Sequence, residues 1–178
     1  MRGGINLMWI MAIAVSFVGG GIDWRTRRLP NWLTAPGFVL GLAGNTWLFG
    51  WPGMRGAMLG AGIALVLLLP IVLLRGLGAG DWKLMGALGA LVSSREILHL
   101  LFLTILVAGV IATVQIFRQG AARTTLKHLY QLVLGFFVFG LKPHPDLNID
   151  NPAGQTFPFG VAAALATVLC YFLALHGV

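Results

Sequence analysis

Long apolar runs alternate along this chain with short polar stretches that carry its charge. A helix that crosses about 30 Å of hydrocarbon needs about 20 residues, which sets the length to look for. Five runs without Lys, Arg, Asp or Glu are long enough, and each is expected to form a membrane-spanning helix: residues 5–22, 32–50, 56–74, 97–117 and 158–178. The first turn of a helix tolerates proline, as at Pro36 and Pro158, whereas Pro70 is expected to kink the third span near its end.

A sixth span is expected at residues 76–94, between the third and the last two. Residues 84–94 carry one apolar run of only eleven residues, which is too short to cross by itself. Extension back to Gly76 gives nineteen residues and a length of about 28 Å. This extension places Asp81 inside the edge of the membrane, and the long side chain of Lys83 can reach the headgroups.

Residues 129–141 form another apolar run, but thirteen residues are few for a crossing. An interfacial or buried helix is favoured there over a span. Residues 143–157 are polar and rich in Pro, Asn and Asp, which is typical of a loop.

The composition agrees with a membrane protein, since 58% of the residues are hydrophobic and only 10% are charged. Soluble domains carry about 25% charged residues. We therefore expect an all-α, polytopic membrane protein of about six helices, with residues 1–178 forming a single domain. The net charge of +7 could indicate nucleic acid, but the cationic residues lie in short clusters between apolar runs. That pattern fits membrane topology and contact with lipids instead.

The distribution of Lys and Arg predicts the orientation, because cytoplasmic loops are enriched in them. Six spans with the N-terminus outside place nine of the twelve cationic residues inside: Arg25, Arg27, Arg28, Arg75, Lys83, Arg118, Arg123, Lys127 and Lys142. The other three, Arg2, Arg55 and Arg95, then lie outside. In this topology Asp23 and Asp81 both reach the cytoplasmic edge of the membrane.

These two aspartates are the candidate chemistry of the chain, which has only five acidic residues. An ionisable group near hydrocarbon is costly and marks a functional site by default. Two close carboxylates resist simultaneous ionisation and tend to share one proton, so that one can activate water while the other donates a proton. Such chemistry needs no metal or other cofactor, and no Gly-x-Ser-x-Gly motif or metal-ligand spacing of histidines competes with it. The alternative for Asp81 is a structural ion pair with Lys83 or Arg75. The alternative for Asp23 is a charge at the helix end that is bridged to Arg25 or Arg27.

Glycines surround Asp81, in Gly78-Ala79-Gly80-Asp81-Trp82-Lys83-Leu84. Without a Cβ atom, Gly78 and Gly80 allow a substrate or backbone to approach closely. Gly86 and Gly89 are expected to allow tight helix packing.

Around Asp23, the simplest role of the arginines is topology and lipid contact, and Asn31 is expected to cap the second span. Trp24 and Trp82 are expected at the membrane interface.

The stretch Gly78-Ala79-Gly80-Asp81 resembles the GxGD motif of intramembrane aspartyl proteases, and its continuation through Leu84 resembles the motif of type IV prepilin peptidases. Asp23, followed by Leu29-Pro30-Asn31, resembles the first aspartate motif of that family. Pro158-Phe159-Gly160 is similar to a further, weaker family feature. The two aspartate motifs stand in the family's order on compatible spans.

The resemblance implies that Asp23 and Asp81 are catalytic and that the protein cuts the leader from pilin-like precursors at the cytoplasmic face of a bacterial inner membrane. Gly78, Gly80, Lys83, Pro30 and Asn31 are implied as supporting or substrate-binding residues. The chain is similar to the short members found with tight-adherence (Flp) pilus systems. It lacks the cysteine-containing insertion of larger members, many of which also methylate the new N-terminus, so methylation stays open.

A non-enzymatic alternative also stays open. A small transporter or pilus-assembly subunit could use Asp23 and Asp81 to bind an ion or relay a proton. Ion flux would favour that alternative, whereas shortening of a pilin precursor would favour a peptidase. The oligomeric state is not indicated by the sequence.

Overall fold

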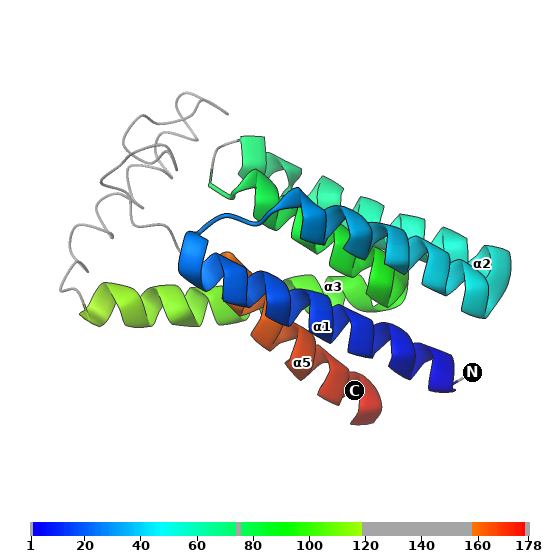
Figure 1. The fold of residues 1–178 in the computed structure, drawn as a ribbon. Coiled ribbons are helices and arrows are strands. Elements are labelled where there is room, and N and C mark those ends of the chain that lie inside the picture. The colour runs from blue at the N-terminus through cyan, green and yellow to red at the C-terminus, as the bar shows by residue number, and fades with distance from the viewer. Residues whose placement is uncertain (1, 74–75, 119–157, 177–178) are drawn as a thin grey trace.

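The computed structural model describes residues 2–73, 76–118 and 158–176, and within these ranges it contains helices and no strand (Figure 1). The elements are α1 (Arg2–Thr26), α2 (Asn31–Leu73), α3 (Ala79–Arg118) and α5 (Phe159–His176). Each of α1, α2 and α3 is long and apolar enough to cross a membrane, and α5 is a shorter apolar helix. The expected all-α class is confirmed, while the number of crossings and their direction stay predictions.

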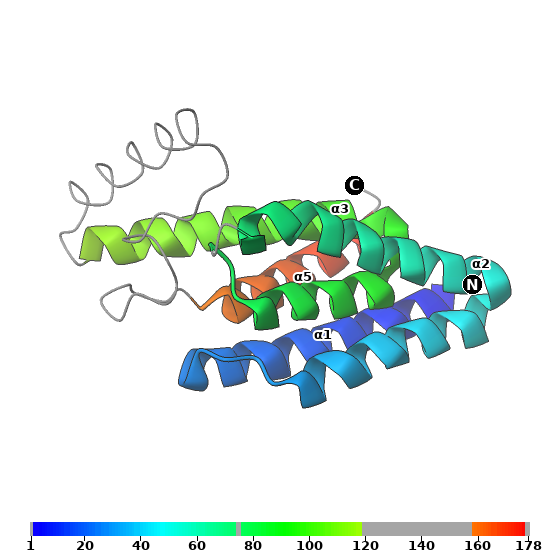
Figure 2. The same ribbon diagram turned by 90° about the horizontal axis from the view of Figure 1, so that it is seen from above.

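Helices α2 and α3 each fold back on themselves at a single residue (Figures 1 and 2). In α2 the break lies at Gly50, with φ 64° and ψ −149°, a region that glycine adopts readily. In α3 it lies at Ser93, with φ 67° and ψ 177°. Each long helix is thus a pair of antiparallel segments, and the segment limits lie close to those of the expected spans.

The third and fourth segments begin at other residues than expected. The fourth segment begins at Ala79, so residues 76–78 lie outside the helix, in line with the weak helix propensity of glycine. The third segment begins directly after Gly50 and continues through Pro70 to Leu73, and no residue between Gly50 and Leu73 has non-helical backbone angles. A proline can bend a helix whose φ and ψ angles stay helical, so the kink expected at Pro70 stays a prediction. The expected helix at 129–141 and the loop at 143–157 lie outside the described residues.

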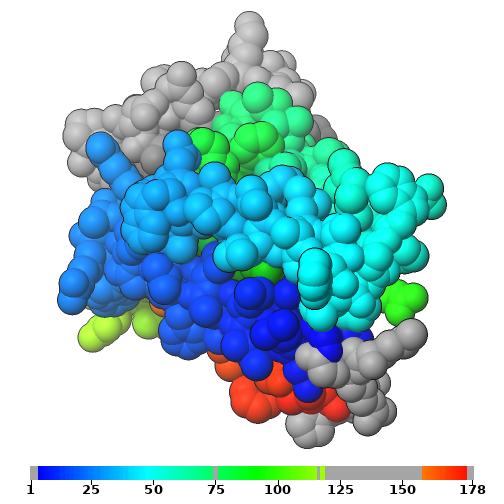
Figure 3. Space-filling view, turned by 45° about the vertical axis from the view of Figure 1, so that its right-hand side comes forward, coloured from blue at the N-terminus to red at the C-terminus, as the bar shows by residue number. Residues whose placement is uncertain are grey.

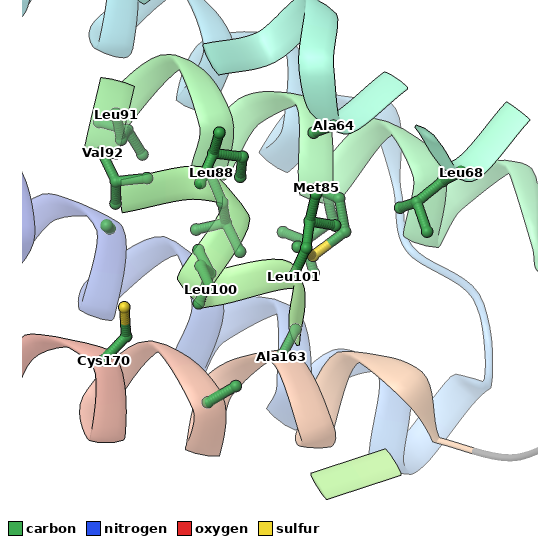
Figure 4. Packing of buried hydrophobic residues seen from close by; sticks show 14 of the residues in the cluster. Ala64, Leu68, Met85, Leu88, Leu91, Val92, Leu100, Leu101, Ala163 and Cys170 are labelled. Atoms are coloured by element: carbon green, nitrogen blue, oxygen red, sulfur yellow. The ribbon is translucent and has the colours of Figure 1, made fainter. Parts of the chain in front are cut away.

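The first half of α3 forms the centre of the bundle. Every residue from 84 to 92 is buried, and Leu84, Met85 and Leu88 are among the largest fully buried side chains. Figure 4 shows Met85 and Leu88 among buried residues of α2 and α5, including Ala64 and Ala163. At about 21 Å this segment is short for a membrane helix. Its position between the other helices shields most of it from lipid.

Glycines bring α2 and α3 into backbone contact. A Cβ atom added at Gly60 or Gly89 would collide with the backbone of the opposite helix, and one at Gly41 would lie 2.7 Å from the Ala90 carbonyl carbon. The expected packing role of Gly89 is confirmed by this contact. A Cβ at Gly86 would also be crowded, 2.9 Å from a methyl group of Leu65.

Asn45 holds the break in α3. Its side chain is buried, and Nδ2 donates to the carbonyls of Ala90 and Leu91 at 3.0 and 3.1 Å. The break at Ser93 deprives these carbonyls of regular helical partners. The Ser93 hydroxyl donates to Asn45 Oδ1 at 3.3 Å. Unpaired backbone groups are costly in an apolar bundle. By bonding these carbonyls, Asn45 allows α3 to change direction within the bundle.

The bundle has two distinct ends. The α1–α2 connection and the starts of α3 and α5 lie together at one end, here called the aspartate end, and the breaks at Gly50 and Ser93 lie at the other (Figures 1 and 2). Five cationic residues in the described ranges lie at or near the aspartate end: Arg25, Arg27, Arg28, Lys83 and Arg118. Arg2, Arg55 and Arg95 lie toward the opposite end.

The outer faces of the helices are apolar. Figure 3 shows α1 and the first half of α2 next to each other on one face of the molecule. Both expose large apolar side chains, among them Ile10, Phe17, Val39 and Leu40. A broad apolar surface of this kind suits contact with lipid.

We predict that Asn45→Ala destabilises the protein by about 1–3 kcal/mol, because it leaves buried carbonyls of α3 without a donor. The measurement is the midpoint of unfolding in detergent as sodium dodecyl sulfate is added. Thr46→Val is the matched control, since the Thr46 hydroxyl bonds only the Leu42 carbonyl of its own helix. Equal stability of the two variants would contradict the role of Asn45.

Candidate active site

Asp23 lies in the last turn of α1 and is almost fully enclosed, with 4% of its surface exposed. Its Oδ2 atom accepts a hydrogen bond of 2.8 Å from the backbone N–H of Gly160. Gly160 belongs to the first turn of α5, where backbone N–H groups have no partner within the helix. The helix dipole also favours a negative charge at this position. Asp23 therefore caps a helix that lies 137 residues further along the chain.

The chain leaves α1 through a tight turn at Arg27, four residues after Asp23. Arg27 has a φ of 53°, a left-handed conformation common just beyond a helix end, and its N–H donates to the Asp23 carbonyl at 2.9 Å. The Pro30 carbonyl then accepts the first hydrogen bonds of α2. Asn31 is thus the first helical residue rather than the expected cap.

Asp81 lies in the first turn of α3, where an acidic residue is favoured by the helix dipole. It is partly exposed, and its carboxyl group lies against Gly78. A Cβ atom added at Gly78 would come within 2.9 Å of Asp81 Oδ2. The absence of a side chain at residue 78 therefore makes room for the carboxyl group.

Gly80 brings the two aspartate segments together. A Cβ atom added there would lie 2.9 Å from Leu29 Cβ and 3.1 Å from the Leu29 carbonyl oxygen. The turn after α1 is therefore pressed against the start of α3. Lys83 also connects these two segments at the exposed surface, where its Nζ donates to Asn31 Oδ1 at 2.9 Å.

A pocket of about 310 Å³ opens between these segments. Both aspartates line it, close enough for Asp23 to act electrostatically on Asp81. The full lining is Asp23, Arg27, Arg28, Leu29, Gly78, Ala79, Gly80 and Asp81. Two carboxyl groups facing one small pocket can hold a water molecule between them and share one proton.

The residues expected to support the site divide into two groups. Gly78 and Gly80 line the pocket and shape it. Pro30, Asn31 and Lys83 do not appear in its lining, although the Lys83–Asn31 bond fixes the segments that form it. Substrate contact by these three residues stays a prediction.

The two tryptophans beside the aspartates lie in different surroundings. Trp24 is 64% exposed, as an interfacial residue would be. Trp82 is partly buried, and its Nε1 donates to the Leu65 carbonyl at 2.8 Å. Trp82 thereby attaches the start of α3 to the second half of α2.

Sequence reasoning missed two contributions to the site. It considered Arg27 as an ion-pair partner of Asp23 but gave the arginines no binding role beyond lipid contact. In the structure Arg27 and Arg28 line the pocket, and Arg27 acts electrostatically on Asp23. It also gave Gly160 no role in the site. The stretch Pro158-Phe159-Gly160, a proline and a glycine at the start of an apolar helix, is the signal that could have directed attention there.

Within the described ranges, no three His, Cys, Asp or Glu side chains gather where they could hold a metal ion. The site therefore offers carboxyl groups, backbone donors and two arginines as its chemical groups. Acid–base activation of a water molecule is the chemistry that this set can perform.

Comparison with known proteins gives two matches. Residues 9–113, which include both aspartates, match the model of the type IV leader peptidase family. A protein of Xanthomonas campestris pv. campestris named prepilin leader peptidase/N-methyltransferase is 34% identical over 128 residues. That alignment covers 67% of this chain and 44% of the relative, so the chain spans less than half of the relative's length. No solved structure matches the chain.

We predict that Gly80→Ala destabilises the protein by about 1–3 kcal/mol, because the added methyl group collides with Leu29 and no flexible side chain can yield. The measurement is the thermal unfolding midpoint in detergent. Gly109→Ala is the control on the same helix, since its Cβ would meet nothing within 4 Å. It should be neutral or stabilising by up to about 1 kcal/mol. A tolerated Gly80→Ala would contradict the close contact between the two segments.

Proposed function

The chain belongs to the type IV leader peptidase family, and from that premise we propose that it is an aspartic endopeptidase with Asp23 and Asp81 as its catalytic pair. Its proposed substrates are type IV pilin-like precursors, from which it removes the leader peptide. The observation that carries this proposal is the shared pocket, which is lined by Asp23 and Asp81 from two helices that lie far apart in the sequence.

In the proposed reaction the pair begins with one proton between its two carboxyl groups. The ionised carboxylate takes a proton from water as the water oxygen bonds to the scissile carbonyl carbon, and the protonated carboxyl group gives its proton to the carbonyl oxygen. The resulting diol then loses a proton back to the pair as the leaving amine accepts one and the C–N bond breaks. The pair again holds one proton, and the products are a carboxyl group and an amine.

The surroundings of the pocket suit an extended peptide. Residues 76–78 precede α3 without helical structure, and the glycines there leave the backbone open to close approach. A leader joined to an apolar helix could place its junction at this pocket while the helix lies along the apolar surface of the bundle. Cleavage at the junction of a basic leader and its apolar helix is therefore proposed.

The proposed orientation puts the pocket at the cytoplasmic face. Five cationic residues of the described ranges lie at or near the aspartate end, which is the distribution of an inward-facing end. The proposed location is the bacterial inner membrane, with several crossings and lipid contact along the apolar faces. Removal of a leader at this face would leave the pilin helix in the bilayer.

We predict that Asp23→Asn and Asp81→Asn each abolish cleavage of a pilin precursor by the purified protein in detergent. Asparagine keeps the size and polarity of the side chain but can neither take the proton from water nor share it. The double variant should be no worse than either single variant, because residues that act as a unit are strongly non-additive. The unmodified enzyme should show a bell-shaped pH–rate profile.

Gel filtration and thermal unfolding serve as the folding controls for these variants. Near-native turnover by either well-folded single variant would refute the pair mechanism. Proton or cation flux through reconstituted protein, without any cleavage, would support the ion-pathway alternative instead.

A second prediction concerns orientation. In a Cys170→Ala background, Thr26→Cys at the aspartate end should react with a membrane-impermeant maleimide only after the inner membrane is opened. Trp51→Cys, beside the break at Gly50, should react in intact spheroplasts. Both positions are exposed on the protein. The reverse labelling pattern would place the pocket outside and contradict the proposed orientation.

A further inference from the structure

The two carboxyl groups of the pocket lie in unlike surroundings. Asp23 is almost fully enclosed, and its Oδ2 is held by the Gly160 N–H at 2.8 Å. Asp81 is partly exposed, lies in the first turn of its own helix α3, and is in contact with Gly78 directly before that helix. Within the part of the chain that the structure describes, Asp23 alone of the pair accepts a hydrogen bond from a helix elsewhere in the chain.

The contact between Asp23 and α5 leaves no room for a side chain. A Cβ atom added at Gly160 would lie 2.9 Å from Asp23 Cβ and 3.1 Å from Oδ2. One turn earlier on α1, a Cβ atom at Gly20 would lie 3.0 Å from the Gly160 carbonyl oxygen and 3.3 Å from Ala164 Cβ. The two helices thus meet at near-backbone distance, which fixes the donor relative to the carboxylate.

The charged groups that face Asp23 come from three directions. Arg27 and Arg28 follow it in the turn after α1, and Asp81 faces it from α3. Among the described residues of α5, the N-terminal turn faces Asp23 with the Gly160 N–H, and the helix dipole there favours a negative charge. Lys83 is exposed and bonded to Asn31, outside the lining of the pocket.

We propose that Gly160 is a positioning residue whose backbone N–H keeps Asp23 as the ionised carboxylate that activates water, so that Asp81 is the member that carries the shared proton. This inference rests on the proposed peptidase function, and it assigns unlike roles to the two aspartates. Gly160 lies beyond residues 9–113, the part of the chain that matches the family model.

The first test is Gly160→Ala, assayed by cleavage of a pilin precursor. Loss of one hydrogen bond to a charged group corresponds to a decrease in kcat of about 10- to 100-fold. Alanine keeps the backbone N–H, but its Cβ would lie 2.9 Å from Asp23 Cβ and must displace the carboxylate from the donor. The acidic limb of the kcat/KM profile should therefore move to higher pH, whereas the basic limb should stay in place. Gly21→Ala is the control on α1, since its Cβ would meet nothing within 4 Å. A folded Gly160→Ala variant with the unmodified pH profile overturns the proposal.

The second test observes the N–H itself in the unmodified protein. Labelling with carbonyl-¹³C phenylalanine and ¹⁵N glycine selects the Phe–Gly pairs, which occur at residues 49–50, 139–140 and 159–160. The signal of Gly160 is identified by its loss in Gly160→Ala. Its amide proton shift should depend on pH, and this dependence should vanish in Asp23→Asn but persist in Asp81→Asn. If the pH dependence of the Gly160 amide proton shift is unchanged in Asp23→Asn, the proposal is overturned.

The two tests separate failure of this inference from failure of the proposed function. Cleavage by a well-folded Asp23→Asn variant contradicts the catalytic pair whatever the amide signal does, and the inference falls with it. If Asp23→Asn is inactive while Gly160→Ala keeps the unmodified rate and pH profile, only the role of Gly160 is overturned.

Discussion

The cost of enclosing a carboxylate among apolar helices governs the arrangement of this protein. Asp23 is nearly inaccessible, and the first turn of α5 supplies the N–H that it needs. To reach that position, α1 and α5 must meet at near-backbone distance, which requires small residues at Gly20 and Gly160. The start of α3 must then fit against the turn after α1, which requires Gly80. The pocket follows from these contacts.

The cost of burying an unpaired polar group also governs the opposite end of the bundle, where α3 changes direction inside the protein. The break at Ser93 is possible because Asn45 donates to the carbonyls of Ala90 and Leu91. This turn lets a helical segment of about 21 Å occupy the centre of the bundle and present Asp81 at its other end. The polar groups of both ends are thereby satisfied without exposing backbone to lipid.

Much of this arrangement could be predicted from the sequence, because apolar runs of a fixed length mark membrane helices and two aspartates beside such runs are conspicuous. Within the described residues, the pattern located the helical segments and the aspartates that line the pocket. It could not find the role of Asn45, since a single asparagine within an apolar run carries no signal of its distant partner. The stretch Pro158-Phe159-Gly160 was noticed, but nothing in it indicates that Gly160 bonds Asp23. The pattern placed the start of the fourth segment too early, because hydropathy reports membrane depth and not helix limits.

The central claim is that Asp23 and Asp81 face one pocket, and cross-linking tests it most directly. In a Cys170→Ala background, a short bifunctional thiol reagent should join Asp23→Cys to Asp81→Cys in the detergent-solubilised protein. The comparison pair is Asp23→Cys with Lys83→Cys, two residues further along α3 and outside the pocket lining. The account predicts efficient cross-linking of the first pair and little of the second. Efficient cross-linking of the second pair with none of the first would contradict it.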